Sequence, residues 1–404
     1  MKTYHPMSFV LALLFALLLI SCGGSGSGTT MTAADSGGIG GTGHTNISVG
    51  SITAFGSIVV NGTEFDTSEA VIIVEGEKIG VGDDTVLANL DIGRMVTVEG
   101  TGSEDDNSAV ADRVMYNDDV EGPVESIQDI DPATKEIVVL GQTVTLNVIT
   151  EFKGTTFDTI AQNDVVEVSG MVDNTGAIWA TFVEKTGEFV PGLVVEVTGL
   201  VENLDTDLKT FEINDLTVDY SSIDPADLPD DFADGLLVEV EGTLDAPGAE
   251  MLATEIELED ELGSEDADEF EITGFVTSFV SVFEFTVGYQ QVVQTDEDTE
   301  FVDGTAEDIA PGVKLEAEGS LVDGILFAEE IEFWEPDQIE IEGVVTEFVS
   351  PSEFTVGDQV VHTDAETVFE GITPDEIEVG LLLEVKGRLV GSILVADKVS
   401  LEDE

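Results

Sequence analysis

The sequence predicts an all-β protein that consists of about five tandem copies of one small domain behind an N-terminal export segment. Two observations carry this prediction. Apolar and acidic residues alternate in short stretches such as residues 238–241 and 339–342, a period typical of a strand with one buried and one solvated face. Three short signatures also recur five times in the same order, and the first of them recurs at spacings of 72, 77, 75 and 69 residues. One β domain repeated along the chain explains both observations.

The three signatures mark equivalent positions in each copy. The first is a glycine followed two positions later by isoleucine or valine, at Gly50, Gly122, Gly199, Gly274 and Gly343. The second is a strand-like stretch that ends in glycine, at Gly100, Gly170, Gly242, Gly319 and Gly387. The third is an alanine with an aliphatic residue three positions later, at Ala111, Ala180, Ala253, Ala328 and Ala396. Seven residues before the second signature stand Gly93, Asn163, Gly235, Gly312 and Gly380. Since asparagine is the next-best residue after glycine for a left-handed backbone, we expect a positive-φ turn there.

The last copy gives the clearest strand pattern. We expect strands at 339–348, at 354–362 with a break at 357–358, at 367–369, at 381–387 and at 392–401. Thr373, Pro374 and Glu376 predict a capped helical turn between the third and fourth strands. Five strands with a turn in that place are the order of an OB-like barrel, and a glycine in the first strand suits a strand that bends to serve both halves. A two-sheet β-sandwich with the same strand count is the alternative.

The landmarks divide the chain into consecutive segments. These are a lipoprotein signal peptide at 1–21, a Gly/Ser/Thr tether at 22–46, and β repeats at 47–117, 118–187, 188–262, 263–335 and 336–404. A unit of about 70 residues buries only about 60% of the surface that its unfolded chain exposes, so we expect contacts between neighbouring repeats to stabilise them. The acidic stretch at 260–269 is the expected flexible joint.

The N-terminus predicts export and a lipid anchor. Lys2 precedes an apolar run at 9–20, which is about 18 Å long as a helix and too short for a hydrocarbon core of about 30 Å. The end of the run and the two residues after it, Leu19-Ile20-Ser21-Cys22, resemble the lipobox of bacterial lipoproteins. That resemblance implies that Cys22 carries the acyl chains, palmitate among them, and becomes the first mature residue. By analogy with lipoprotein sorting, Gly23 in place of aspartate implies the outer membrane. The protein is then expected on either the periplasmic or the outer face of that membrane.

The charge limits the partners. Acidic residues outnumber basic ones by 86 to 12, and the net charge is −74. A body of this charge repels phosphate backbones and anionic lipid, which argues against nucleic acid as a partner. The membrane is therefore an expected partner through the lipid on Cys22 alone.

Candidate chemistry is sparse in the mature sequence. Cys22 is the only cysteine, and His362 has no counterpart in the other copies, so we expect no enzyme and no cofactor. Calcium is the best ion candidate, because it takes oxygen ligands from loops. Paired aspartates follow the expected first strand in two copies, at Asp129, Asp131, Asp205 and Asp207. Ordinary turn chemistry, in which an aspartate binds its own backbone, explains these pairs equally well.

Two tryptophans are candidates for sugar stacking. Trp179 precedes the alanine of the second copy and is expected to pack in the core. Trp334 lies in the connector between the last two copies, where packing between repeats is its expected role.

The whole arrangement looks like a family of bacterial lipoproteins with repeated domains of unknown function. The first two copies carry the resemblance best, at residues 50–65 and 139–144, and the third departs most through an insertion at 220–234. The resemblance implies no catalytic residues. More distantly, the repeats are similar to small periplasmic OB-fold proteins, which implies contact with a ligand.

Three functions follow, in order of support. The first is a non-catalytic, lipid-anchored structural or adhesive scaffold of the cell envelope, with an envelope polysaccharide or another surface protein as a further partner. The second is a binding module for an oligosaccharide, an envelope polymer or calcium. An envelope hydrolase has the least support, because no copy has a polar constellation that the others lack.

Overall fold

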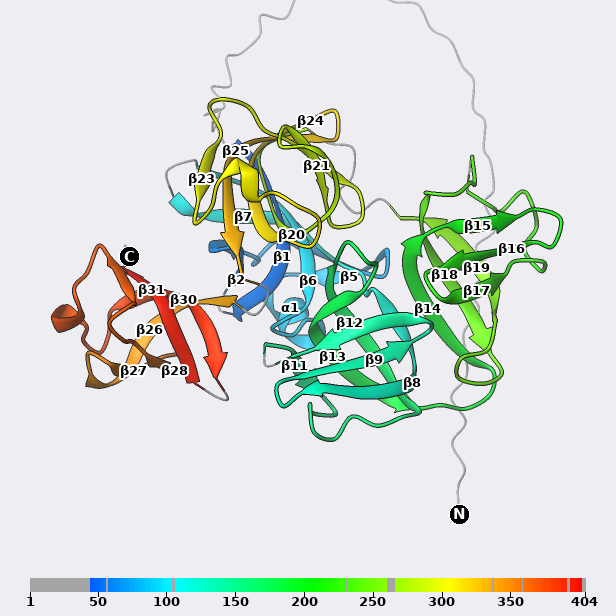
Figure 1. Cartoon of the computed structure of the whole chain (residues 1–404), viewed down its shortest axis with the longest axis horizontal. Coiled ribbons are helices and arrows are strands. Elements are labelled where there is room, and N and C mark those ends of the chain that lie inside the picture. Colours follow the sequence, from blue (N-terminus) through cyan, green and yellow to red (C-terminus); the bar gives the residue numbers. More distant parts are fainter. Residues whose placement is uncertain are drawn as a thin grey trace, which may run out of the picture. The chain divides into compact units, whose positions relative to one another are not determined.

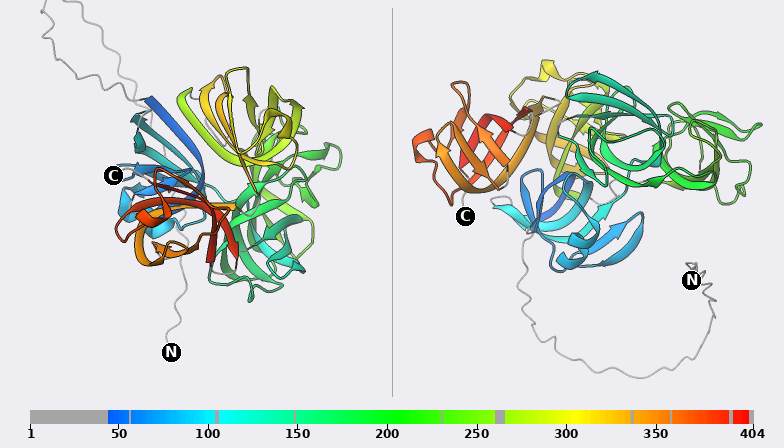
Figure 2. Two further views of the ribbon diagram at one scale, coloured as in Figure 1. Left: turned by 60° about the vertical axis from the view of Figure 1, so that its left-hand side comes forward. Right: turned by 90° about the horizontal axis from the view of Figure 1, so that it is seen from below.

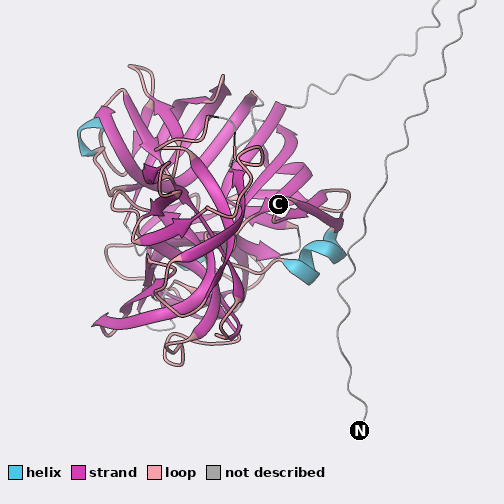
Figure 3. Ribbon diagram, turned by 90° about the vertical axis from the view of Figure 1, so that its right-hand side faces the viewer, coloured by secondary structure: helices cyan, strands magenta, loops and turns pink. Residues whose placement is uncertain are grey.

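The computed structural model describes residues 44–401 except 56, 104–105, 148, 230, 260–265, 336–337, 358 and 391–392. The expected signal peptide, Cys22 and nearly all of the tether lie outside the described residues. The described part is a succession of β-strands with one short α-helix and two 3₁₀ turns (Figures 1 and 3). None of the described helices is long and apolar enough to cross a membrane. The expected all-β class is confirmed.

The strands form five barrels in succession. The first contains β1 (His44–Phe55), β2 (Ile58–Val60), β3 (Thr63–Asp66), β4 (Val71–Val74), β5 (Glu77–Val81), α1 (Asp83–Asn89), β6 (Met95–Ser103) and β7 (Asp106–Tyr116). The second contains β8 (Val120–Asp131), β9 (Thr134–Val139), β10 (Gln142–Leu146), β11 (Glu151–Lys153), β12 (Asp164–Val172) and β13 (Ile178–Glu188). The third contains β14 (Leu193–Leu200), β15 (Glu202–Asp205), β16 (Thr210–Ile213), β17 (Leu216–Asp219), β18 (Leu237–Leu244) and β19 (Met251–Leu258).

The last two barrels have the same order. The fourth contains β20 (Ala267–Ser281), β21 (Glu284–Val287), β22 (Gln291–Gln294), β23 (Glu300–Val302), the turn η1 (Ala306–Asp308), β24 (Lys314–Val322) and β25 (Ile325–Trp334). The fifth contains β26 (Gln338–Ser350), β27 (Glu353–Val356), β28 (Gln359–His362), β29 (Val368–Glu370), the turn η2 (Pro374–Glu376), β30 (Leu382–Val390) and β31 (Ile393–Leu401). We call the five barrels repeats 1 to 5.

Strand pairing closes each barrel in the OB-like order. In repeat 5 the first strand β26 pairs antiparallel with β30 along its first half and with β27 along its second half. The antiparallel pair β27–β28, the parallel pair β28–β31 and the antiparallel pair β30–β31 complete the ring. The same ring forms in the other repeats, although β14 and β15 share the role of the first strand in repeat 3. The OB-like barrel is therefore confirmed, and the sandwich alternative is wrong.

The backbone landmarks predicted from the sequence have the expected conformations. The residues before the fourth strand have positive φ in all five repeats: Gly93 (92°), Asn163 (71°), Gly235 (87°), Gly312 (86°) and Gly380 (101°). The glycine of the second signature lies at a β-bulge in each repeat. At Gly242 a Cβ atom would lie 2.6 Å from the carbonyl oxygen of Leu252, so the close strand approach requires glycine.

Apolar side chains fill the barrel interiors. In repeat 4 the core contains Phe270, Phe285, Leu315 and Ile331, each fully or almost fully buried. The alternation of apolar and acidic residues places the carboxylates of the same strands on the outer face. The outer faces are therefore what one repeat presents to another.

Two pairs of repeats share main-chain hydrogen bonds. The first strands of repeats 1 and 4 run parallel, with residues 46–49 of β1 beside residues 269–272 of β20. Repeats 2 and 3 join through β8 and β14, where Val120 pairs with Val197. Figures 1 and 2 show the blue strands of repeat 1 beside the yellow strands of repeat 4. Residues 267–269 of the expected flexible joint belong to β20, and residues 260–265 lie outside the described part.

Candidate functional site

The connector between repeats 1 and 2 has only three residues and is bound by four repeats. The side chain of Asn117 donates to Glu259 of repeat 3 at 2.9 Å. The backbone amide of Asp118 donates to Glu75 of repeat 1 at 3.1 Å. The carboxylate of Asp119 accepts hydrogen bonds from residues of repeats 2 and 4. The connector is thus a junction of four repeats.

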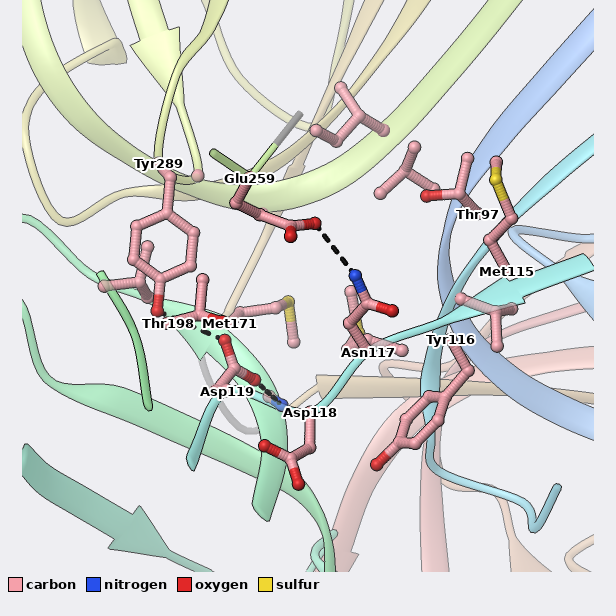
Figure 4. A pocket seen from close by; sticks show the side chains of 18 of the residues that line it. Thr97, Met115, Tyr116, Asn117, Asp118, Asp119, Met171, Thr198, Glu259 and Tyr289 are labelled. Atoms are coloured by element: carbon pink, nitrogen blue, oxygen red, sulfur yellow. Dashed lines mark hydrogen bonds between the residues drawn. The ribbon is translucent and has the colours of Figure 1, made fainter. Parts of the chain in front are cut away.

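Asp119 occupies a partly buried position in this junction (Figure 4). It accepts the backbone amide of Gly170 at 2.8 Å and the hydroxyl of Tyr289 at 3.2 Å. Its own carbonyl accepts the amide of Thr198 at 3.0 Å. Burial raises the pKa of Asp119 to about 7, although both hydrogen bonds act in the opposite direction.

A cavity of about 160 Å³ lies beside the connector (Figure 4). Its walls are mainly apolar and include three methionines, Met95, Met115 and Met171. Tyr289 and Thr198 add polar groups. Because pockets for drug-sized ligands usually measure about 300–1,000 Å³, this cavity suits only a few atoms.

Three glutamates from repeats 1 and 3 converge next to the connector, and we call them the carboxylate cluster. Glu75 lies in the turn between β4 and β5, where it has a φ of 47° and precedes Gly76. Glu196 lies on β14 and Glu239 on the neighbouring strand β18. One carboxylate oxygen from each lies within 4.8 Å of the other two. All three side chains are partly buried.

The pKa values of the carboxylate cluster are raised. Burial, followed by the charge of Glu196, raises the pKa of Glu75 to about 9. Burial and the same neighbour raise the pKa of Glu239 to about 7. Burial, followed by the charges of Glu75 and Glu196, also raises the pKa of Asp118. Among the described residues, no ion pair involves any of the three glutamates, and so repulsion between like charges is not offset.

Two side-chain oxygens at this junction are buried without a hydrogen-bond partner, Oδ1 of Asp118 and Oγ1 of Thr198. Glu75 and Glu196, in contrast, share a hydrogen bond between their carboxyl groups. Asp118 and Thr198 are each only 7% exposed. Buried polar atoms are normally paired, so two unpaired oxygens in one place require an explanation.

Arg94 holds repeats 1 and 2 together at a second junction. Its guanidinium group pairs with Glu167 and, at 2.9 Å, with Glu184. It also lies between the rings of Tyr116 and Phe182, 4.4 Å from each centroid. Arg94 is only 4% exposed. One of the few basic residues of the chain is thus buried between two repeats.

Lysines and a tryptophan perform the same task between repeats 4 and 5. Nζ of Lys386 lies 3.9 Å from the ring centroid of Trp334 and pairs with Glu332. Lys314 lies on the same ring at 5.0 Å and donates to the carbonyl of Gln338 at 3.2 Å. Both lysines are buried, so Trp334 packs between repeats as the sequence predicted.

The structure places the sequence-predicted residues as follows. Asp131 and Asp205 cap their own turns by accepting backbone amides two residues ahead, at 2.7 and 2.9 Å. Asp129 pairs with Lys135 at 3.0 Å, and Asp207 donates its amide to Asp205. None of the four belongs to the carboxylate cluster. Calcium binding at these four aspartates stays a prediction, and Cys22 lies outside the described residues.

Trp179 does not have the core position expected from the sequence. Its ring is partly buried and lies 5.4 Å from the ring of Phe275 in repeat 4, and its Nε1 donates to Asp173 at 3.0 Å. The expectation failed because the outer face of β13 is covered by another repeat.

Sequence reasoning missed the carboxylate cluster. Glu196 and Glu239 alternate with valines and are typical of a solvated strand face. At Glu75 the sequence shows only a turn, because Gly76 follows it. The positive φ of Glu75, which is rare for glutamate, is visible only in the structure.

Comparisons with known proteins agree with the repeats. Residues 121–184, 198–257, 273–332 and 342–400 match the family described as "Domain of unknown function (DUF5666)". These ranges are more than half of the chain and fall in repeats 2 to 5. The expectation that the first two copies match best is therefore wrong for repeat 1, and repeat 3 matches despite its insertion.

No curated protein matches the chain. Among solved structures, the chain is similar to one titled "drosophila Unr CSD456", with 16% identity and a TM-score of 0.13. That match covers 54% of this chain and 98% of the other. The fold assignment rests on the strand order, not on this likeness.

Proposed function

The chain belongs to the DUF5666 family, and we propose that it is a non-catalytic, lipid-anchored scaffold of the cell envelope. The observation that carries the proposal is that the repeats share sheets, through β1 with β20 and through β8 with β14. Their buried polar contacts, such as those of Arg94, join one repeat to another. Such contacts hold neighbouring repeats in place, and they favour a structural role over action on a substrate.

Cys22 carries the anchoring part of the proposal. The apolar run at 9–20 and the cysteine that follows it resemble a lipoprotein export signal, which implies an outer-membrane location. Substitution Cys22→Ser should release the protein from membranes into the soluble envelope fraction. Ser21→Ala is the matched control and should stay in the membrane pellet. Equal sedimentation of the Cys22→Ser protein with membranes would contradict the anchor.

A scaffold requires that the repeats keep fixed distances from one another, and this can be measured. Spin labels at Thr254 on repeat 3 and Glu347 on repeat 5, both exposed, should give a narrow distance distribution by pulsed electron resonance. A distribution as broad as that of a flexible linker would mean independent domains and would contradict the scaffold.

A binding module for an oligosaccharide or an envelope polymer is the second proposal. The exposed aromatic side chains Phe279 and Phe283, at the tip of the first hairpin of repeat 4, favour it, since exposed rings stack on sugars. Saturable binding on a glycan array that is lost with Phe279→Ser/Phe283→Ser would support this function. It would also favour an envelope polysaccharide over another surface protein as the partner.

A further inference from the structure

We propose that Glu75, Glu196 and Glu239 form a calcium site that joins repeats 1 and 3, with Asp118 and Thr198 as further oxygen ligands. The proposal does not depend on the lipid anchor. It assigns an ion to residues other than the four aspartates predicted from the sequence.

The spacing of the oxygens fits one ion. Calcium binds oxygen at about 2.3–2.6 Å, so two ligands of one ion are at most about 5 Å apart. The three carboxylate oxygens lie within 4.8 Å of one another, inside that limit. Magnesium demands near-octahedral order and usually keeps several waters, whereas calcium accepts six to eight oxygens in flexible geometry. A site built from side-chain oxygens of two repeats therefore favours calcium.

Two buried neighbours point to a ligand independently of the cluster. Thr198 stands opposite Glu239 in the β14–β18 register and two residues from Glu196, so its side chain lies on the same face of the sheet as both. Its Oγ1 is buried and has no hydrogen-bond partner. Asp118 binds Glu75 through its backbone amide, and its Oδ1 is also buried without a partner. A cation would satisfy both oxygens.

The electrostatics agree with a divalent ion. Burial, followed by the charge of Glu196, raises the pKa of Glu75 to about 9 when no cation offsets them. An ion of charge +2 would offset the repulsion between these carboxylates.

Calorimetry on the full chain in nonionic detergent tests the proposal. The protein is stripped with EDTA and titrated with CaCl₂ at high NaCl, where condensation on surface carboxylates is screened. We expect one saturable site and a higher melting temperature with calcium. Absence of saturable binding, an unchanged melting temperature, or equal affinity for MgCl₂ would overturn the assignment.

Variants separate this site from the general acidity of the surface. Glu196→Gln/Glu239→Gln should weaken calcium at least tenfold, whereas Asp129→Asn/Asp205→Asn removes the same charge and should bind like the parent. The reverse result would overturn the proposal and favour the turn aspartates. If the first variant fails to fold by circular dichroism, Thr198→Val, which keeps the side-chain volume, should weaken binding several-fold, and unchanged affinity there would refute the site.

Discussion

Arg94 offers the sharpest test of how the repeats are held together. Substitution Arg94→Met keeps much of the side-chain volume but removes the charge from between Tyr116 and Phe182. It leaves the carboxylates of Glu167 and Glu184, which are 18% and 22% exposed, without their cation. We therefore expect the folded state to lose the contact between repeats 1 and 2 first.

The size of the effect follows from burial. Removal of one partner from a buried ion pair costs about 3–5 kcal/mol, because the other charge stays desolvated. Each ring contact with a desolvated cation adds about 1–2 kcal/mol, but these terms overlap with the ion pairs. Since the two carboxylates keep some contact with water, we expect a loss of about 4 kcal/mol. Arg94→Lys keeps the charge but not the planar fork, and should lose about 1–2 kcal/mol.

Urea unfolding followed by tryptophan fluorescence measures this loss, because Trp179 lies at a contact between repeats 2 and 4. The matched control is Arg388→Met, whose parent side chain is 51% exposed and pairs with Asp397 at 3.1 Å. An exposed pair should contribute less than about 1 kcal/mol. If Arg94→Met lowers the free energy of unfolding no more than Arg388→Met does, Arg94 does not hold repeats 1 and 2 together.

Three further predictions concern the junction and the barrels. In EDTA, the free energy of unfolding should fall by at least about 3 kcal/mol between pH 5 and pH 9. The folded state raises the pKa of Glu75 to about 9 and that of Glu239 to about 7, so both carboxyls stabilise it while protonated and lose that contribution as the pH rises through these values; a flat or rising curve in denaturant titrations would contradict this. Gly242→Ala at the β-bulge should lower the stability by about 2–3 kcal/mol, whereas Gly187→Ala, which meets no atom within 4 Å, should change it by less than about 1 kcal/mol in the same assay. Tyr289→Phe removes a hydrogen bond to the partly buried carboxylate of Asp119 and should cost about 1 kcal/mol by thermal unfolding; an unchanged stability would contradict a structural role for this bond.

The sequence was sufficient to predict the barrel because the determinants of the barrel are local. The bulge at Gly242, the positive-φ turn at Asn163 and the cap formed by Thr373 and Glu376 each follow from the chemistry of a few adjacent residues. Their fivefold recurrence made the pattern stronger than any single copy. The cap is confirmed by mutual hydrogen bonds, at 2.6 and 3.0 Å, between the two residues.

The junctions could not be predicted because they depend on which outer faces meet. Glu196 and Glu255 both alternate with apolar residues, yet the first is partly buried at a junction and the second is exposed. Nothing local distinguishes them, since the difference lies in a strand pair that repeat 2 supplies. Trp179 was assigned to a core for the same reason, because a covered outer face and an interior give similar sequence patterns.

The parallel contact between β1 and β20 has a consequence for the assembly of the protein. The side chain of Asn46 binds Glu269, 223 residues further along the chain, at 2.7 Å. Closing so long a segment is slow, and strands that wait unpaired expose an edge to other chains. Strand β1 therefore finds its partner in repeat 4 only after about two-thirds of the polypeptide has been made. Repeat 1 is made first but is packed late, so a chaperone that shields the edge of β1 would raise the yield of the folded protein.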